Sequence, residues 1–203
     1  MTVNCIKSID ELKSNINEIY KTTYKKLANN IYKGHLRTMS FDVEDQITIF
    51  LSKILPNGYK FFIDPQISVN KKNHRPDMLI INKDNNVVAM LEIKAQMGYC
   101  RNASWVIDKI IEYDNKFKNS QLNCNLKVEE EPYNYQAVNY GSNVKLFLIS
   151  FSDWNCSAAN HKNNIEYAKS KNVFYYTLFS GWYNSLENID IEDFARKICE
   201  LNN

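Results

Sequence analysis

The sequence predicts a mixed α/β fold, in which a central mixed sheet of about five strands is flanked by helices and preceded by an N-terminal helical segment. Apolar residues recur at helical spacing over the first 55 residues, and short runs rich in β-branched and aromatic residues follow them. A strand, helix, strand order then returns near the C-terminus, which is typical of parallel pairing. The 203 residues, 44% of them hydrophobic and 24% charged, indicate one globular domain over residues 1–203.

The N-terminal region is predicted to be helical. A capping box that starts at Ser8 precedes a long amphipathic helix, which would end at Gly34 and occupy most of residues 1–40. A second helix would begin at Ser40 or Asp42 and end before Pro56.

The remaining elements form a core over residues 41–179 and a C-terminal helical segment over residues 180–203. Three antiparallel strands are expected first, and the polar stretch 119–143 is expected to be a long loop. The expected elements are strands at 60–69, 77–82 and 87–95, a helix at 103–118, strands at 145–151 and 173–179 joined by a helix at 162–169, and a last helix capped by Asp190.

Composition excludes several classes of function. A formal charge of +2 excludes a polybasic nucleic-acid clamp but permits a local basic groove. The five cysteines are scattered without metal-ligand spacing, and neither a secretory apolar core nor a membrane-length apolar run is present. We therefore expect a cytoplasmic protein with no membrane partner. The absence of a glycine-rich phosphate loop argues against a nucleotide cofactor.

Two short segments, Arg75-Pro76-Asp77 and Glu92-Ile93-Lys94, carry the charged residues of most interest. Alternate side chains on a strand share a face, so Glu92 and Lys94 project together while Ile93 packs behind them. Charges on largely buried strands are costly unless they are paired or bound to metal. Two carboxylates suit a hard cation such as Mg²⁺. Lys94 would stabilise developing negative charge or, with a lowered pKa, orient or deprotonate the attacking water.

These residues resemble the motif of the PD-(D/E)XK nucleases, in which a Pro-Asp pair on one strand precedes a Glu-X-Lys on the next. Pro76, Asp77, Glu92 and Lys94 match that pattern, and the order of elements predicted over residues 42–151 is similar to the family core. The resemblance implies a restriction endonuclease-like fold and a nuclease domain that cleaves double-stranded DNA with Mg²⁺, or with Mn²⁺ in its place. The alternative is a structural ion-pair ladder in the sheet.

The resemblance also implies roles for individual residues. Asp77, Glu92 and the backbone carbonyl of Ile93 would bind the metal, and Lys94 would complete the catalytic site. The family commonly has a further acidic residue on the helix before the first strand. Glu44 is the best candidate for it, with Asp42 and Asp45 as competitors, although acidic residues also favour a helix N-terminus for dipolar reasons.

Residues near the motif could contact nucleic acid. The basic run beside Asp77 contains Lys71, Lys72 and Arg75, and Gln96 continues the alternation of Glu92 and Lys94. At the start of the next predicted helix, backbone amides and side chains could hold a phosphate, and the residues there are Arg101, Asn102 and Ser104. Asn102 could equally serve as an N-cap and Gln96 as a surface residue.

The resemblance leads to a specific hypothesis, a type II restriction enzyme that acts as a homodimer on a palindromic site. The alternatives are a repair, recombination or transposition nuclease or an RNA nuclease of the same fold, and a non-catalytic nucleic-acid-binding module.

The register of the expected hairpin matters for the site. A two-residue turn at Asp84 and Asn85 would place Asp77 directly opposite Glu92, at a spacing over which two carboxylates can share one cation. A turn one residue later would set Asp77 against Lys94 on the same face. An odd loop length would turn Asp77 away from Glu92 unless a β-bulge compensates.

Overall fold

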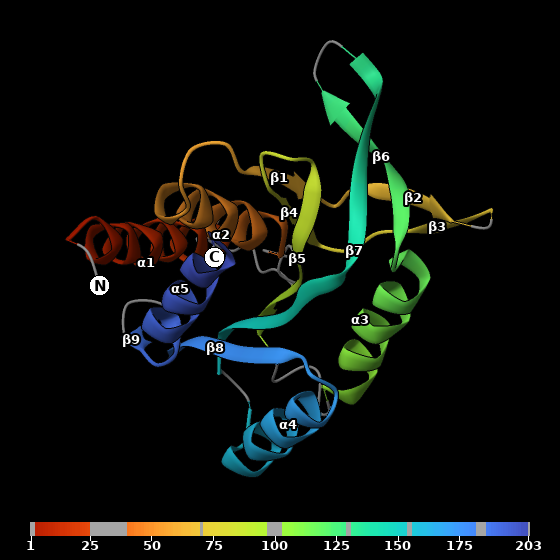
Figure 1. Cartoon of the computed structure of the whole chain (residues 1–203). Helices are drawn as coiled ribbons and strands as arrows, with labels where there is room; N and C mark the ends of the chain where they lie inside the picture. Colours follow the sequence, from red (N-terminus) through yellow and green to blue (C-terminus); the bar gives the residue numbers. More distant parts are fainter. Residues whose placement is uncertain are drawn as a thin grey trace, which may run out of the picture.

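The computed structural model describes residues 3–24, 40–69, 71–96, 103–128, 131–153, 156–181 and 186–202. Within these ranges nine strands form one mixed sheet, and helices pack on both of its faces (Figure 1). The mixed α/β class is therefore confirmed, with nine strands in place of the five expected. No helix in the described ranges is long and apolar enough to cross a membrane.

The sheet is built around two long strands. Its members are β1 (Lys60–Ile63), β2 (Gln66–Val69), β3 (Lys72–His74), β4 (Met78–Ile81), β5 (Asn86–Gln96), β6 (Ser120–Val128), β7 (Glu131–Ser152), β8 (Phe174–Ser180) and β9 (Glu187–Asn188). The main order is β1-β4-β5-β7-β6-β2-β3, and β8 pairs with both β7 and β9. β7 is parallel to β5 and to β8, and the other pairs are antiparallel.

Two hydrophobic cores lie on opposite faces of this sheet, because alternate strand residues point to opposite sides. One core joins Leu91 and Ile149 to the first two helices and the last, and the other joins Met90 and Leu148 to the third and fourth. The helices are α1 (Val3–Tyr24), α2 (Ser40–Ile54), α3 (Ser104–Phe117), α4 (Ala158–Ser170) and α5 (Ile191–Cys199), with a short 3₁₀ turn at Glu200–Asn202.

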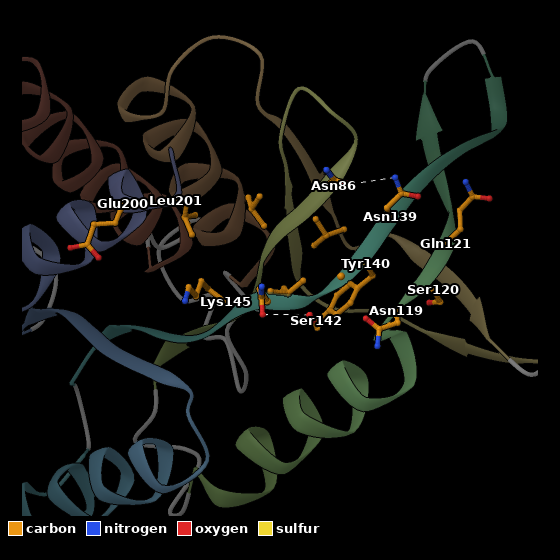
Figure 2. Close-up of a pocket in the computed structure, with 15 residues that line it drawn as sticks. Asn86, Asn119, Ser120, Gln121, Asn139, Tyr140, Ser142, Lys145, Glu200 and Leu201 are labelled. Carbon is orange, nitrogen blue, oxygen red and sulfur yellow. Dashed lines mark hydrogen bonds between the residues drawn. The ribbon is translucent and has the colours of Figure 1, made fainter. Parts of the chain in front are cut away.

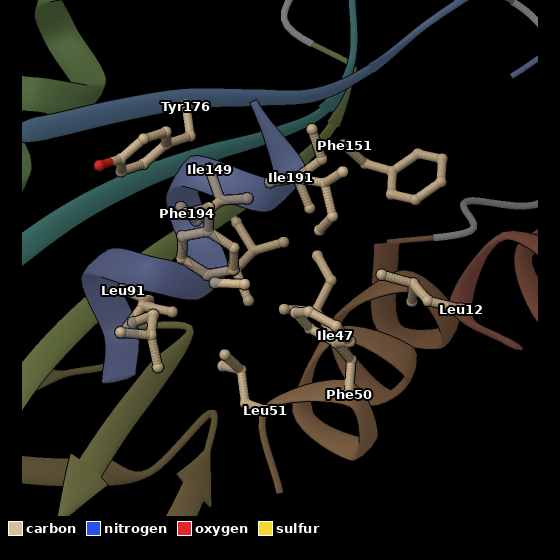
Figure 3. Close-up of a cluster of buried hydrophobic side chains, with 14 of the residues drawn as sticks. Leu12, Ile47, Phe50, Leu51, Leu91, Ile149, Phe151, Tyr176, Ile191 and Phe194 are labelled. Atoms are coloured by element: carbon tan, nitrogen blue, oxygen red, sulfur yellow. The ribbon is translucent and has the colours of Figure 1, made fainter. Parts of the chain in front are cut away.

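The first core fixes the position of α2. Ile47, Phe50 and Leu51 of α2 are fully or almost fully buried, and they pack with Leu91 of β5 and Phe194 of α5 (Figure 3). α2 also contacts β1. This packing holds the first turns of α2, which carry Glu44, against the part of the sheet that bears the PD-(D/E)XK-like motif.

The β4–β5 hairpin has an odd loop and a compensating bulge. The backbone amide of Asn82 donates to the Asn86 carbonyl, so three residues form the loop, and the last of them, Asn85, has a positive φ of 57°. The two-residue turn predicted from the sequence is therefore wrong. The pairing shifts between Ile80 and Ile81, which leaves Val88 as an extra residue in β5.

Two segments differ from the sequence prediction. Residues 119–143 are not a loop, because β6 and the first half of β7 pair there as an antiparallel hairpin. Leu122 and Cys124 are buried under α3 while Gln121 and Asn123 are exposed, so the segment is polar on only one face. The expected strand at 60–69 is two strands, interrupted at Asp64, whose φ is 44°.

The predicted helices are found, but two of the predicted caps are not. α1 begins at Val3, so Ser8 lies inside the helix and does not cap it, and the expected stop at Gly34 lies outside the described residues. The predicted second helix and the three later helices are confirmed as α2, α3, α4 and α5. Asp190 occupies the N-cap position of α5, but its side chain makes no capping hydrogen bond and accepts one from the Thr177 backbone amide instead.

Candidate active site

Asp77 and Glu92 lie on neighbouring strands of the sheet, on the face covered by α3. The pairing of Met78 with Leu91 places Asp77, the residue before β4, opposite Glu92. The backbone amide of Ile93 donates a hydrogen bond of 2.7 Å to Asp77 Oδ2, which fixes that carboxylate. The Glu92 side chain is only 3% exposed, so its charge requires partners.

Lys94 lies at the point where three oxygen atoms converge. Its Nζ is 3.0 Å from Asp77 Oδ2, 2.9 Å from Glu92 Oε1 and 3.1 Å from the Ile93 carbonyl oxygen, so its three protons have three acceptors. These three residues are the predicted metal ligands. The arrangement shows that their oxygens can surround one cation, and two carboxylates with one carbonyl suit a hard divalent ion.

Such an ion would need water as well. Among the residues that the structure describes, no three His, Cys, Asp or Glu side chains gather at metal-binding distance. Mg²⁺ usually keeps several waters and takes only one or two protein carboxylates, so the donor set at Asp77 and Glu92 fits it.

The electrostatic environment keeps Lys94 protonated. Burial opposes the charge, but the neighbouring Glu92 and Asp77 carboxylates outweigh it and raise the pKa of Lys94. Of the two roles that the sequence left open for Lys94, stabilising negative charge fits this protonated state. A lowered pKa, which a general base would need, is not found.

Glu44 of α2 lies near enough to Asp77 and Lys94 for their charges to act on its carboxyl. The residue is 6% exposed, and no residue in the described ranges donates a hydrogen bond to its carboxyl. Burial, followed by the nearby Asp77 charge, raises the pKa of Glu44 from 4.5 to about 8. Asp42 and Asp45 are exposed. Of the three acidic residues considered for this helix, Glu44 is thus the buried one that interacts with Asp77.

The sequence prediction missed Lys109 of α3. Its Nζ lies 2.7 Å from Glu92 Oε1, the same oxygen that binds Lys94, and 5.3 Å from the centroid of the Tyr113 ring. One signal could have found it. Lys109 follows Val106 by three residues and precedes Tyr113 by four, so it lies toward the face of α3 that packs on the sheet.

The predicted nucleic-acid contacts are spread more widely. Lys71 and Lys72 are exposed on the β2–β3 hairpin, which Figure 1 shows extending away from α1 and α2. Arg75 donates to Asp64 Oδ2 at 3.2 Å and to Gln66 Oε1 at 3.0 Å, and about half of its side chain is exposed.

The four other candidates are Gln96, Arg101, Asn102 and Ser104. Gln96 is the last residue of β5 and pairs with Ser152, and its side chain is outside the described part. Arg101 and Asn102 also lie outside the described residues. Ser104 is the first residue of α3, and the N-cap position is Ala103.

A separate pocket of about 680 Å³ lies at the start of β5, where Asn86, Val87 and Val88 form part of its lining (Figure 2). The β5–β7 pairing jumps from Val87 with Tyr140 to Ala89 with Lys145, which leaves residues 141–144 outside the ladder. None of the predicted site residues lines this pocket. Its polar lining consists mainly of uncharged amides and hydroxyls, from Asn86, Asn119, Ser120, Gln121, Asn139, Ser142 and Asn143.

Comparison with known proteins identifies the fold. No protein-family model matches the sequence, and no curated protein matches it. The solved structure of NucC from P. aeruginosa ATCC27853, in a cAAA-bound form, is similar, with a TM-score of 0.58 over 100% of this chain and 91% of that one. The chain has a restriction-endonuclease-like fold. At 10% sequence identity the likeness concerns the fold alone.

Proposed function

We propose that this chain is a divalent-metal-dependent endonuclease that hydrolyses phosphodiester bonds of double-stranded DNA. The observation that carries the proposal is the convergence of Asp77, Glu92 and the Ile93 carbonyl on one cationic group. Two further observations support it. The fold is similar to that of NucC, and the Pro-Asp and Glu-Ile-Lys segments resemble the PD-(D/E)XK motif.

The residues would divide the work as follows. Asp77, Glu92 and the Ile93 carbonyl would hold Mg²⁺, or Mn²⁺ in its place, and the bound ion would supply positive charge that polarises the phosphate and activates water. The Lys94 ammonium, displaced from the carboxylates by the ion, would stabilise the negative charge that develops on the phosphate. Glu44, kept neutral by burial, could donate a hydrogen bond to water or accept a proton above its pKa of about 8.

The finer form of the proposal is sequence-specific cleavage by a homodimer, as in type II restriction enzymes. A nuclease that selects DNA or RNA by structure is the second form. NucC was solved with cAAA bound, so cleavage that requires a cyclic oligonucleotide is the third. A non-catalytic nucleic-acid-binding module predicts binding without cleavage.

One experiment separates these forms. Purified protein is incubated with supercoiled plasmid, unmethylated phage DNA or structured RNA in Mg²⁺, Mn²⁺ or EDTA, each with and without cAAA, and the ends are sequenced. Asp77→Asn protein serves as the matched control for contaminating nucleases. Discrete fragments with a common end sequence support restriction specificity, whereas a smear supports cleavage without it. Failure to cut any substrate with either metal contradicts the proposal.

A further inference from the structure

Two lysines from different elements bind one oxygen of Glu92. Lys94 of β5 approaches Glu92 Oε1 at 2.9 Å and Lys109 of α3 approaches it at 2.7 Å. Both ammonium groups form ion pairs with the Glu92 carboxylate. The nearly buried Glu92 charge is thus compensated twice.

The two lysines are not equivalent. Lys94 also binds Asp77 and the Ile93 carbonyl, so its ammonium fills the space among the proposed metal ligands. Lys109 binds none of those other ligands. Its side chain comes from the sheet-facing side of α3, whose buried neighbours are Val106 and Ile110, and its ammonium lies over the Tyr113 ring.

A cation bound by Asp77 and Glu92 must therefore displace Lys94, whereas it need not displace Lys109. A carboxylate has lone pairs enough to bind a metal and accept a hydrogen bond together. Carboxylates that ligate metals are usually held by such an outer partner.

We propose that Lys109 is a positioning residue that keeps Glu92 oriented for the cation after the Lys94 ammonium has left. This inference rests on the proposed function, because it assumes that the three oxygens bind a divalent ion. It assigns opposite effects to two lysines that donate to the same oxygen. Lys94 competes with the ion, and Lys109 supports its ligand.

The test measures Mn²⁺ affinity by isothermal titration calorimetry, with no DNA present. Lys94→Met should bind Mn²⁺ more tightly than wild type because the competing ammonium is gone. Lys109→Met should bind it about tenfold more weakly because an outer partner of the ligand is lost. Lys109→Arg, which keeps charge and donor, should bind close to wild type. Lys116→Met changes another α3 lysine, one paired with the exposed Glu112, and should have no effect.

Each outcome is decisive. If Lys109 acted only through its positive charge, its removal would tighten Mn²⁺ binding. Either tighter binding or unchanged affinity in Lys109→Met would overturn the positioning role, while the metal site itself would remain supported. If neither wild type nor Lys94→Met bound Mn²⁺, the proposed function and the inference would fail together. Thermal unfolding in EDTA checks that each variant folds. If Lys109→Met does not fold, Lys109→Gln replaces it and should still bind Mn²⁺ more weakly than Lys109→Arg does. Binding by Lys109→Gln that is equal to or tighter than that of Lys109→Arg would overturn the positioning role.

Discussion

Asp77 lies opposite Glu92 because one extra residue in β5, Val88, compensates for the three-residue loop of the hairpin. Side chains on a strand alternate between faces, so an odd loop without the bulge would place the two carboxylates on opposite sides of the sheet. The bulge thus sets the geometry of the proposed metal site from four residues away. β-bulges often re-aim side chains next to functional sites.

Deletion of Val88 should abolish DNA cleavage, because it would shift the register and turn either Asp77 or Glu92 away from the site. Insertion of one glycine between Asp84 and Asn85 should be far milder, since an exposed loop beyond the bulge can absorb an added residue. Plasmid cleavage, with circular dichroism to confirm folding, compares the variants. Equal activity of the Val88 deletion and the insertion would contradict the register argument.

Glu44→Gln should stabilise the metal-free protein increasingly as the pH rises from about 4.5 to 8. In this window the unfolded chain has released the Glu44 proton, whereas the folded chain retains it because its pKa is about 8, so the stability of the wild type falls as the pH rises. A difference of one in pKa between the two states corresponds to about 1.4 kcal/mol.

Urea denaturation in EDTA at pH 5 and pH 8.5 measures the effect. The variant should gain more than about 1 kcal/mol over wild type between the two pH values. Glu166→Gln, at an exposed position on α4, is the matched control. A difference between variant and wild type that stays constant with pH would show that Glu44 is ionised in the folded protein.

Replacing both Lys71 and Lys72 with alanine should weaken binding to duplex DNA and flatten its salt dependence. Each lysine that neutralises a phosphate contributes about one to the slope of log affinity against log salt concentration. Fluorescence anisotropy at several salt concentrations, with Ca²⁺ in place of Mg²⁺, gives the slope. Lys162 and Lys169 on α4 provide the paired control substitution. An unchanged slope in the Lys71 and Lys72 variant would mean that the β2–β3 hairpin does not contact DNA.

The part of the site that the sequence predicts depends on short-range patterns. Glu92 and Lys94 share a face through simple alternation, and Asp77 meets them through a local hairpin, so the three are found from neighbouring residues alone. Lys109 comes from a different helix, and a lysine on an amphipathic helix is ordinarily a solvated residue. Its contact with Glu92 depends on how α3 packs against the sheet.

The prediction of the fold was likewise limited to features that short-range sequence patterns determine. The helices and the buried strands have strong apolar periodicity and were predicted at nearly the right positions. The β6–β7 hairpin was missed because its outer face carries Gln121, Asn123 and Asn139, residues with little intrinsic preference for strands. Tertiary pairing with β5 and β2 makes these segments strands, and that pairing is long-range.

Cleavage of supercoiled plasmid in Mg²⁺ by the wild type and by Lys94→Ala measures whether the proposed site performs the hydrolysis. The variant removes the ammonium but leaves Asp77, Glu92 and the Ile93 carbonyl in place, with Lys109 still bound to Glu92. The wild type should cut, and the Lys94→Ala rate should be lower by about a hundredfold or more, in a protein that remains folded. Undiminished cleavage by Lys94→Ala would contradict the proposed active site.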